Sequence, residues 1–196
     1  MYLLKWSNSS QEIAFFSTMD SVPHLLKLLI LGDFRVGKTH LIRGITLQPQ
    51  VLEYQPTFAV VFSKTDFHTE TEAYRLLLWE VGGYPSFTDI AKAYVNSADA
   101  VLVLFSEDKP GSWESRETWL DLIPRDRRSF QVEVLGDSPR SDHPSDLQVQ
   151  PSDAISVRQF FSEVINRVPV NSLTDPDGIQ DFEDLKSRTQ VHCSLL

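Results

Sequence analysis

The residues best suited to chemistry lie in ILGDFRVGKTH, positions 30–40, where Gly32 is followed after four residues by Gly37, Lys38 and Thr39. This G-x-x-x-x-G-K-T spacing is typical of a loop that binds phosphate groups. Backbone N–H groups surround the anion, the lysine faces the β- and γ-phosphates, and the threonine hydroxyl binds Mg²⁺. The candidate phosphate-binding residues are Gly32, Asp33, Phe34, Arg35, Val36, Gly37, Lys38 and Thr39.

The surroundings of this motif support the same interpretation. LLKLLIL (25–31) is a nearly continuous apolar run, which predicts a buried parallel strand. Residues 38–46 have Leu41, Ile42 and Ile45 on one face of a predicted helix. A phosphate-binding loop follows a strand and opens a helix, whereas a chance match to the motif has no such context.

Further elements alternate along the chain and predict an α/β fold. Beyond the first strand and helix, the pattern predicts strands at 58–67, 74–80, 98–106 and 130–136 and helices at 86–97, 112–123 and 156–168. The strands at 58–67 and 74–80 are joined by a short polar turn and form a hairpin. We therefore expect three layers, with helices on both faces of a mostly parallel sheet that contains one antiparallel hairpin strand.

The connection to the last predicted strand, LQVQ (147–150), is unusually short. Only GDSPRSDHPSD separates it from the strand that ends near Leu135. A parallel crossover needs a dozen or more residues and usually a helix, and this stretch has two prolines and no apolar face. Either a helix is missing here, or LQVQ does not join the sheet in the usual way.

Composition and charge set the broad class of protein. The chain has 196 residues, which suits one globular domain at 24–168 with an N-terminal extension at 1–23 and a flexible tail at 169–196. A net charge of −9 argues against nucleic acid as a partner. The single cysteine excludes a disulfide framework and fits a reducing compartment. We expect a monomer.

Two motifs downstream of the loop complete a family pattern. YQPTFAVVF (54–62) has Thr57 before a strand, and LLLWEVGGYPSF (76–87) ends a strand in E-x-G-G. Together with the loop, these segments resemble the small GTPases of the Ras superfamily, and among them the Rab-like branch. The resemblance covers roughly residues 25–168 and implies the P-loop GTPase fold, with GTP or GDP and Mg²⁺ as cofactors.

The resemblance also assigns roles to three residues. Thr57 would bind Mg²⁺ through its hydroxyl and the γ-phosphate through its backbone, Glu80 would hold Mg²⁺ through water, and Gly83 would give its N–H to the γ-phosphate. Glu80 stands where the family has an aspartate. The alternatives are a plain hydroxyl at a strand entry for Thr57, a solvated strand-end carboxylate for Glu80, and a turn glycine for Gly83.

The chain departs from the family where catalysis is expected. Tyr84 stands at the position of the catalytic glutamine, and a phenol cannot orient the attacking water as the amide does. Phe34 and Arg35 replace small residues of the loop and crowd the γ-phosphate. Arg35 is either a built-in cation for catalysis or, as we favour, a solvent-facing loop residue. These departures predict slow hydrolysis.

The guanine-reading motif N-K-x-D is also absent. In its register the chain has Asp137, Ser138, Pro139 and Arg140. Arginine has donors only, so Arg140 cannot accept hydrogen bonds from the guanine ring as the aspartate would. The base loop before the last helix is likewise degraded, to QPS at 150–152. Weakened selectivity for guanine is expected.

The tail carries a possible lipidation site. The printed sequence finishes with Cys193-Ser194-Leu195-Leu196, a C-a-a-X pattern whose final leucine favours geranylgeranyl. We expect a prenyl transferase and an escort protein as partners. One isoprenoid is a weak anchor and the tail has no basic patch, so the protein would exchange between cytosol and the cytoplasmic face of intracellular membranes.

These observations favour a Rab-like small GTPase that recruits effectors through residues 54–62 and 80–87 in vesicle and membrane trafficking. A second hypothesis is a non-cycling pseudo-GTPase scaffold, because E-V-G-G-Y is also similar to Arf-like proteins and to Rab-like subunits of ciliary transport. A third is a P-loop kinase or ATPase. Comparing the binding of GTP, GDP and ATP would distinguish these hypotheses.

Overall fold

The structure is a computed structural model that describes residues 23–50, 53–136 and 143–169. Its centre is a six-stranded sheet in the order β2-β3-β1-β4-β5-β6. The strands are β1 (His24–Gly32), β2 (Val60–His68), β3 (Ala73–Val81), β4 (Ala100–Ser106), β5 (Ser129–Val134) and β6 (Leu147–Val149). Only β2 and β3 pair in antiparallel fashion, and the other neighbours are parallel. The predicted mixed sheet is confirmed.

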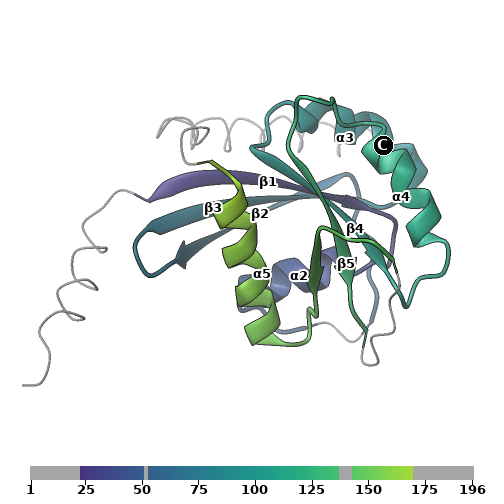
Figure 1. Ribbon diagram of the computed structural model, residues 1–196. Coiled ribbons are helices and arrows are strands. Elements are labelled where there is room, and N and C mark those ends of the chain that lie inside the picture. Colours follow the sequence, from purple (N-terminus) through teal and green to yellow (C-terminus); the bar gives the residue numbers. More distant parts are fainter. Residues whose placement is uncertain (1–22, 51–52, 137–142, 170–196) are drawn as a thin grey trace, which may run out of the picture.

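Helices cover both faces of this sheet, so the domain has three layers (Figure 1). α2 (Lys38–Ile45) and α5 (Ala154–Arg167) pack on one face, and α3 (Thr88–Val95) and α4 (Ser112–Leu120) pack on the other. Strand β1 supplies Leu28 and Ile30 to the first core and Leu29 and Leu31 to the second. Its near-continuous apolar sequence follows from burial on both sides.

The strand register brings separate motifs to one edge of the sheet. Ile30 in β1 lies beside Glu80 in β3, and Gly32 lies beside Leu104 in β4. The loop after β1 and the end of β3 therefore meet at the carboxyl edge of the parallel strands, where ligands of open α/β sheets bind.

Several element boundaries differ from the predicted ones. The helix expected at 86–97 begins with a separate 3₁₀ turn, η1 (Pro85–Phe87), and α3 follows it. Helix α5 begins two residues early because the Asp153 carboxylate accepts from the backbone N–H groups of Ile155 and Ser156, both at 3.1 Å. Helix α4 ends at Leu120 rather than at 123.

The short strand β6 joins the sheet in the ordinary parallel manner. Val132 of β5 lies beside Leu147 of β6. The Asp146 carboxylate accepts from the Gln131 N–H at 2.7 Å, and the Gln131 carbonyl accepts from the Asp146 N–H at 2.9 Å. The alternative in which LQVQ stays outside the sheet was therefore wrong. Of the connection, 135–136 and 143–146 form no helix, and 137–142 lie outside the described residues.

No helix in the ranges that the structure describes combines the length and apolar content needed to cross a bilayer.

Candidate nucleotide-binding site

The loop between β1 and α2 has the backbone shape of an anion-binding turn. Gly32, Arg35 and Gly37 have positive φ angles of 131°, 65° and 96°. At Gly32 a Cβ atom would lie 2.3 Å from the Leu104 carbonyl oxygen, so β4 permits only glycine there. The loop can turn this tightly because two of its three positive-φ positions are glycines, and such turns are a common backbone shape of anion-binding loops.

Lys38 is buried at the base of the loop. Its side chain is 5% exposed, and its Nζ donates to the carbonyl oxygens of Gly32 and Asp33, both at 2.7 Å. Burial lowers the pKa of Lys38 to about 8, against the opposing influence of the negative charges of Glu80 and Asp33. A desolvated ammonium of this kind gains strongly from an anionic ligand, as the phosphate-binding role requires.

Thr39, Thr57 and Glu80 come together beside Lys38. Glu80 Oε1 accepts from Thr39 Oγ1 at 2.5 Å and from Thr57 Oγ1 at 2.9 Å, and the two hydroxyl oxygens are 3.4 Å apart. Glu80 is 2% exposed, so the alternative of a solvated carboxylate was wrong. Thr57 lies just before β2, and its hydroxyl is hydrogen-bonded to Glu80, 23 positions away in the sequence, so its role as a magnesium ligand stays a prediction.

This cluster fits Mg²⁺ chemically. Each hydroxyl gives its proton to Glu80 and keeps its oxygen lone pairs, which are the hard ligands that Mg²⁺ prefers. Within the described ranges no group of three or more His, Cys, Asp or Glu residues gathers as a metal cage. A magnesium ion beside these two hydroxyls and one carboxylate would complete its octahedral shell with phosphate oxygens and water, as is usual for this ion.

A cavity of about 530 Å³ opens over these residues. Its lining includes Lys38, Thr39 and Glu80, residues 53–58, and the arginines Arg35 and Arg43. The three motifs that were singled out separately in the sequence thus line one hollow of a size that suits a small ligand.

The segment after β3 is in direct contact with the loop. The Phe34 N–H donates to the Gly83 carbonyl oxygen at 3.1 Å. A Cβ at Gly83 would lie 2.1 Å from the Phe34 nitrogen, so the close approach of two backbones requires this glycine. The rings of Phe34 and Tyr84 stack with their centroids 5.2 Å apart and an interplanar angle of 13°.

Sequence reasoning missed the residues that anchor the loop from outside. The Asp33 carboxylate accepts from Ser115 Oγ at 2.6 Å and from Trp119 Nε1 at 2.9 Å, both on α4. Lys109 Nζ lies 3.9 Å from the centroid of the Phe34 ring. The apolar face of the predicted helix signalled that Trp119 is buried, but a single sequence gives no sign of partners more than 80 positions apart.

Arg35 turns outward from the loop. It is exposed, and its guanidinium lies 4.8 Å from the centroid of the Tyr54 ring. This arrangement agrees with a solvent-facing arginine, which here also contacts the segment before β2 through a cation–π interaction.

Comparison with known proteins identifies the family. The model of the Ras family matches residues 27–165, which is well over half of the chain. The chain belongs to the Ras family. It is a divergent Rab-like member, since its curated relatives are Ras-related Rab and Ypt proteins at about 26% identity.

Three relatives show how far this sequence has diverged from other members of the family. Ras-related protein YPTC6 of Chlamydomonas reinhardtii is 26% identical over 145 residues, 73% of this chain and 67% of the relative. Ras-related protein RABA1c of Arabidopsis thaliana is 26% identical over 144 residues, 74% of this chain and 66% of the relative. Ras-related protein Rab-7L1 of Rattus norvegicus is 30% identical over 102 residues, 52% of this chain and 50% of the relative. The match thus spans half to two thirds of these relatives.

The positions at which the resemblance would place contacts with the base fall largely outside the described residues. That is so for 137–142, which include Asp137, Ser138, Pro139 and Arg140. Next to them, a Cβ at Gly136 would lie 2.6 Å from the Asp108 Oδ2 atom, so the loop after β4 brings a carboxylate to the end of β5.

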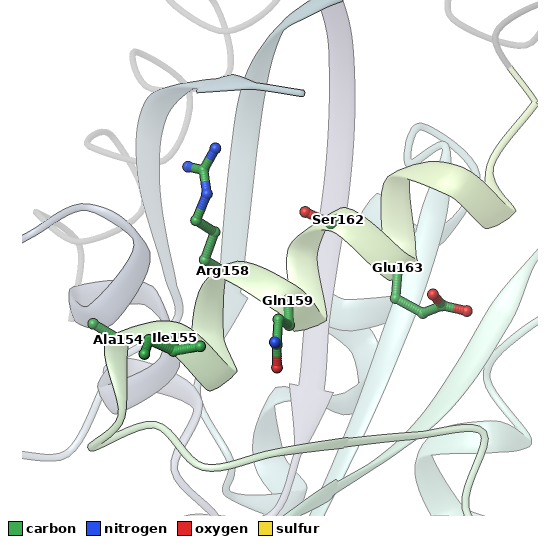
Figure 2. Close-up of a pocket in the computed structure, with 6 residues that line it drawn as sticks. All are labelled: Ala154, Ile155, Arg158, Gln159, Ser162 and Glu163. Atoms are coloured by element: carbon green, nitrogen blue, oxygen red, sulfur yellow. The ribbon is translucent and has the colours of Figure 1, made fainter. Parts of the chain in front are cut away.

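A second hollow of this Ras-family domain lies on the outer face of α5. Figure 2 shows the residues around it, all of which belong to that helix: Ala154, Ile155, Arg158, Gln159, Ser162 and Glu163. Arg158 is already engaged, because it donates to the His68 carbonyl oxygen at 2.8 Å and lies 4.9 Å from the Phe67 ring centroid. A hollow lined by one helix without a phosphate-binding loop is a weaker candidate for a nucleotide site.

Proposed function

We propose that this chain is a Rab-like small GTPase that binds GTP or GDP with Mg²⁺ and recruits effectors in intracellular membrane trafficking. The observation that carries the proposal is the convergence of Lys38, Thr39, Thr57 and Glu80 beneath the phosphate-binding loop. Lys38 would face the β- and γ-phosphates, the two threonine hydroxyls would bind Mg²⁺, and Glu80 would orient them.

Slow hydrolysis is part of the proposal. Tyr84 stacks on Phe34, so its ring is held over the loop and offers no amide to position water. The Phe34 ring contacts both Tyr84 and Lys109, which supports the view that an arginine from an activating protein is obstructed there.

The surface around the cavity is suited to the binding of effector proteins. Among the exposed large apolar side chains are Tyr54 (42%), Phe58 (71%), Val61 (45%) and Tyr84 (37%). They belong to the predicted effector segments 54–62 and 80–87. Aromatic side chains exposed close together are typical anchors of protein interfaces.

One observation favours the second candidate, a non-cycling scaffold. Gly83 is already docked on the loop through its carbonyl oxygen, whereas in the cycling mechanism the segment around Gly83 rearranges when the γ-phosphate binds and leaves. Measuring exchange and hydrolysis of bound nucleotide separates the two functions, since a scaffold would not convert GTP to GDP between partners.

Weak discrimination between GTP and ATP is the expected result of competition binding. Loss of the charged acceptor at position 140 should remove a few kcal/mol of guanine preference. Labelled GTP, GDP and ATP, each with and without Mg²⁺, provide the measurement. A sharp submicromolar preference for GTP would show that another carboxylate reads the base, with Asp108, Asp137 and Asp142 as the residues to replace next.

Membrane attachment is proposed to depend on Cys193, which lies outside the described residues. For the 196-residue chain expressed as printed, Cys193→Ser should move the protein from the membrane fraction to the soluble fraction. Ser194→Ala is the matched control, since it leaves the thiol in place. An unchanged membrane fraction for Cys193→Ser would assign attachment to a partner or to the N-terminal extension.

A further inference from the structure

The Gly83 carbonyl oxygen accepts a hydrogen bond from the backbone N–H of Phe34 in the loop. The Phe34 nitrogen and the Gly83 oxygen are 3.1 Å apart, and a Cβ on Gly83 would overlap the loop backbone. A donor and an acceptor already at hydrogen-bond distance leave no room for a phosphate oxygen between them. A carbonyl oxygen also repels an anion.

Side chains extend this backbone contact. Tyr84 stacks on one face of Phe34, and Lys109 Nζ lies 3.9 Å from the centroid of the same ring. Phe87 packs edge-on against Tyr84 with centroids 6.3 Å apart. We call Gly83, Tyr84 and Phe87 the lid. Opening it breaks the Phe34–Gly83 hydrogen bond, unstacks Tyr84 from Phe34, and disturbs the packing of Phe87 against the core on the α3 side of the sheet.

The loop side of the contact is fixed. Asp33 is hydrogen-bonded to Ser115 and Trp119, and Trp119 is a buried residue of α4. Tyr84, by contrast, is exposed, as are the next two residues of the chain. A ligand that needs the space between loop and lid must therefore move the lid, because the loop is held in the core.

We propose that the lid makes this chain select a nucleoside diphosphate over the corresponding triphosphate, with the Phe34–Tyr84 stack as the specificity-determining contact. A diphosphate can occupy the loop beside Lys38 while the lid remains in place. The additional terminal phosphate must displace the Gly83 carbonyl and unstack Tyr84. Breaking these contacts therefore weakens the binding of the triphosphate and leaves the binding of the diphosphate unchanged. The inference rests on the proposed function.

The expected preference follows from the two contacts. An aromatic stack and a backbone hydrogen bond each correspond to about threefold to tenfold in affinity. Together they predict a ratio on the order of tenfold to hundredfold between the dissociation constants of a non-hydrolysable GTP analogue and of GDP.

Equilibrium titration of the full chain with fluorescent GDP and with a fluorescent non-hydrolysable GTP analogue, both in Mg²⁺, measures this ratio. Tyr84→Ala should reduce the ratio by about threefold to tenfold, because the stack is lost. Tyr84→Phe keeps the ring and should keep the wild-type ratio. Ile155→Ala, an exposed apolar position on α5, controls for a general effect of removing surface area.

The outcomes separate this inference from the proposed function. Equal wild-type affinities, or a ratio that Tyr84→Ala leaves unchanged, would overturn the role of the lid while GDP binding still supports a nucleotide site. Absence of binding by either nucleotide would overturn both. Should Tyr84→Ala fail to fold, Phe34→Leu removes the same stack from the loop side and serves as the test.

Discussion

Replacement of Lys38 by alanine is expected to abolish measurable nucleotide binding. Lys38 is the buried cation at the base of the loop, and it is already hydrogen-bonded to two carbonyl oxygens there. Losing its charge-assisted bonds to phosphate should weaken GDP binding by about 10²–10⁴-fold. Fluorescent-nucleotide titration is the measurement.

The controls separate binding from folding. Lys38→Met keeps most of the buried volume and should lose binding as Lys38→Ala does, because both lack the ammonium. Lys92→Ala removes an exposed lysine on α3 and should bind like the wild type. Retained GDP binding in a folded Lys38→Ala protein would mean that the site lies elsewhere in the chain.

Cleavage of GTP by the purified protein is expected to be very slow, with little response to activating proteins. Hydrolysis in this family depends on positioning water and on stabilising charge at the γ-phosphate. Tyr84 lacks the water-positioning amide, and we expect the ring of Phe34, which stacks on Tyr84, to obstruct an external arginine. Loss of the catalytic arginine alone typically lowers the rate of hydrolysis by a factor on the order of 10³–10⁵. Single-turnover GTP cleavage measures the outcome.

Restoring the glutamine is expected to help only modestly. Tyr84→Gln supplies the amide, but Phe34 and the longer carboxylate of Glu80 remain. Tyr84→Phe is the matched control, because it alters the same position without adding an amide. A wild-type rate equal to that of an ordinary small GTPase would contradict this expectation. The variant Arg35→Ala would then test whether Arg35 replaces the arginine of an activating protein.

The fold could be predicted because its signals are local. The continuous apolar run at 25–31 indicated burial on both faces, and the two cores on either side of β1 explain it. The loop motif depended on residues adjacent in sequence, so its position between a strand and a helix was also predictable. The cap at Asp153 was missed, which shifted the start of α5 by two residues.

The remaining part of the site depends on contacts between distant positions. Glu80 is buried and accepts hydrogen bonds from two threonines because of the register of the strands. A single sequence predicts strand register only weakly. The role of the Gly83 N–H stays a prediction, whereas the hydrogen bond from the Phe34 N–H to the Gly83 carbonyl oxygen had no signal in the sequence. The links from Asp33 to α4 had no sequence signal beyond an apolar helix face.

The most direct test of the central claim is equilibrium titration of the wild-type chain with fluorescent GDP, with Mg²⁺ and then with the metal chelated. We expect saturable one-to-one binding that weakens when Mg²⁺ is removed, because Thr39, Thr57 and Glu80 would hold the ion against phosphate oxygens. Absence of saturable binding in both conditions, by a protein shown to be folded, would contradict it.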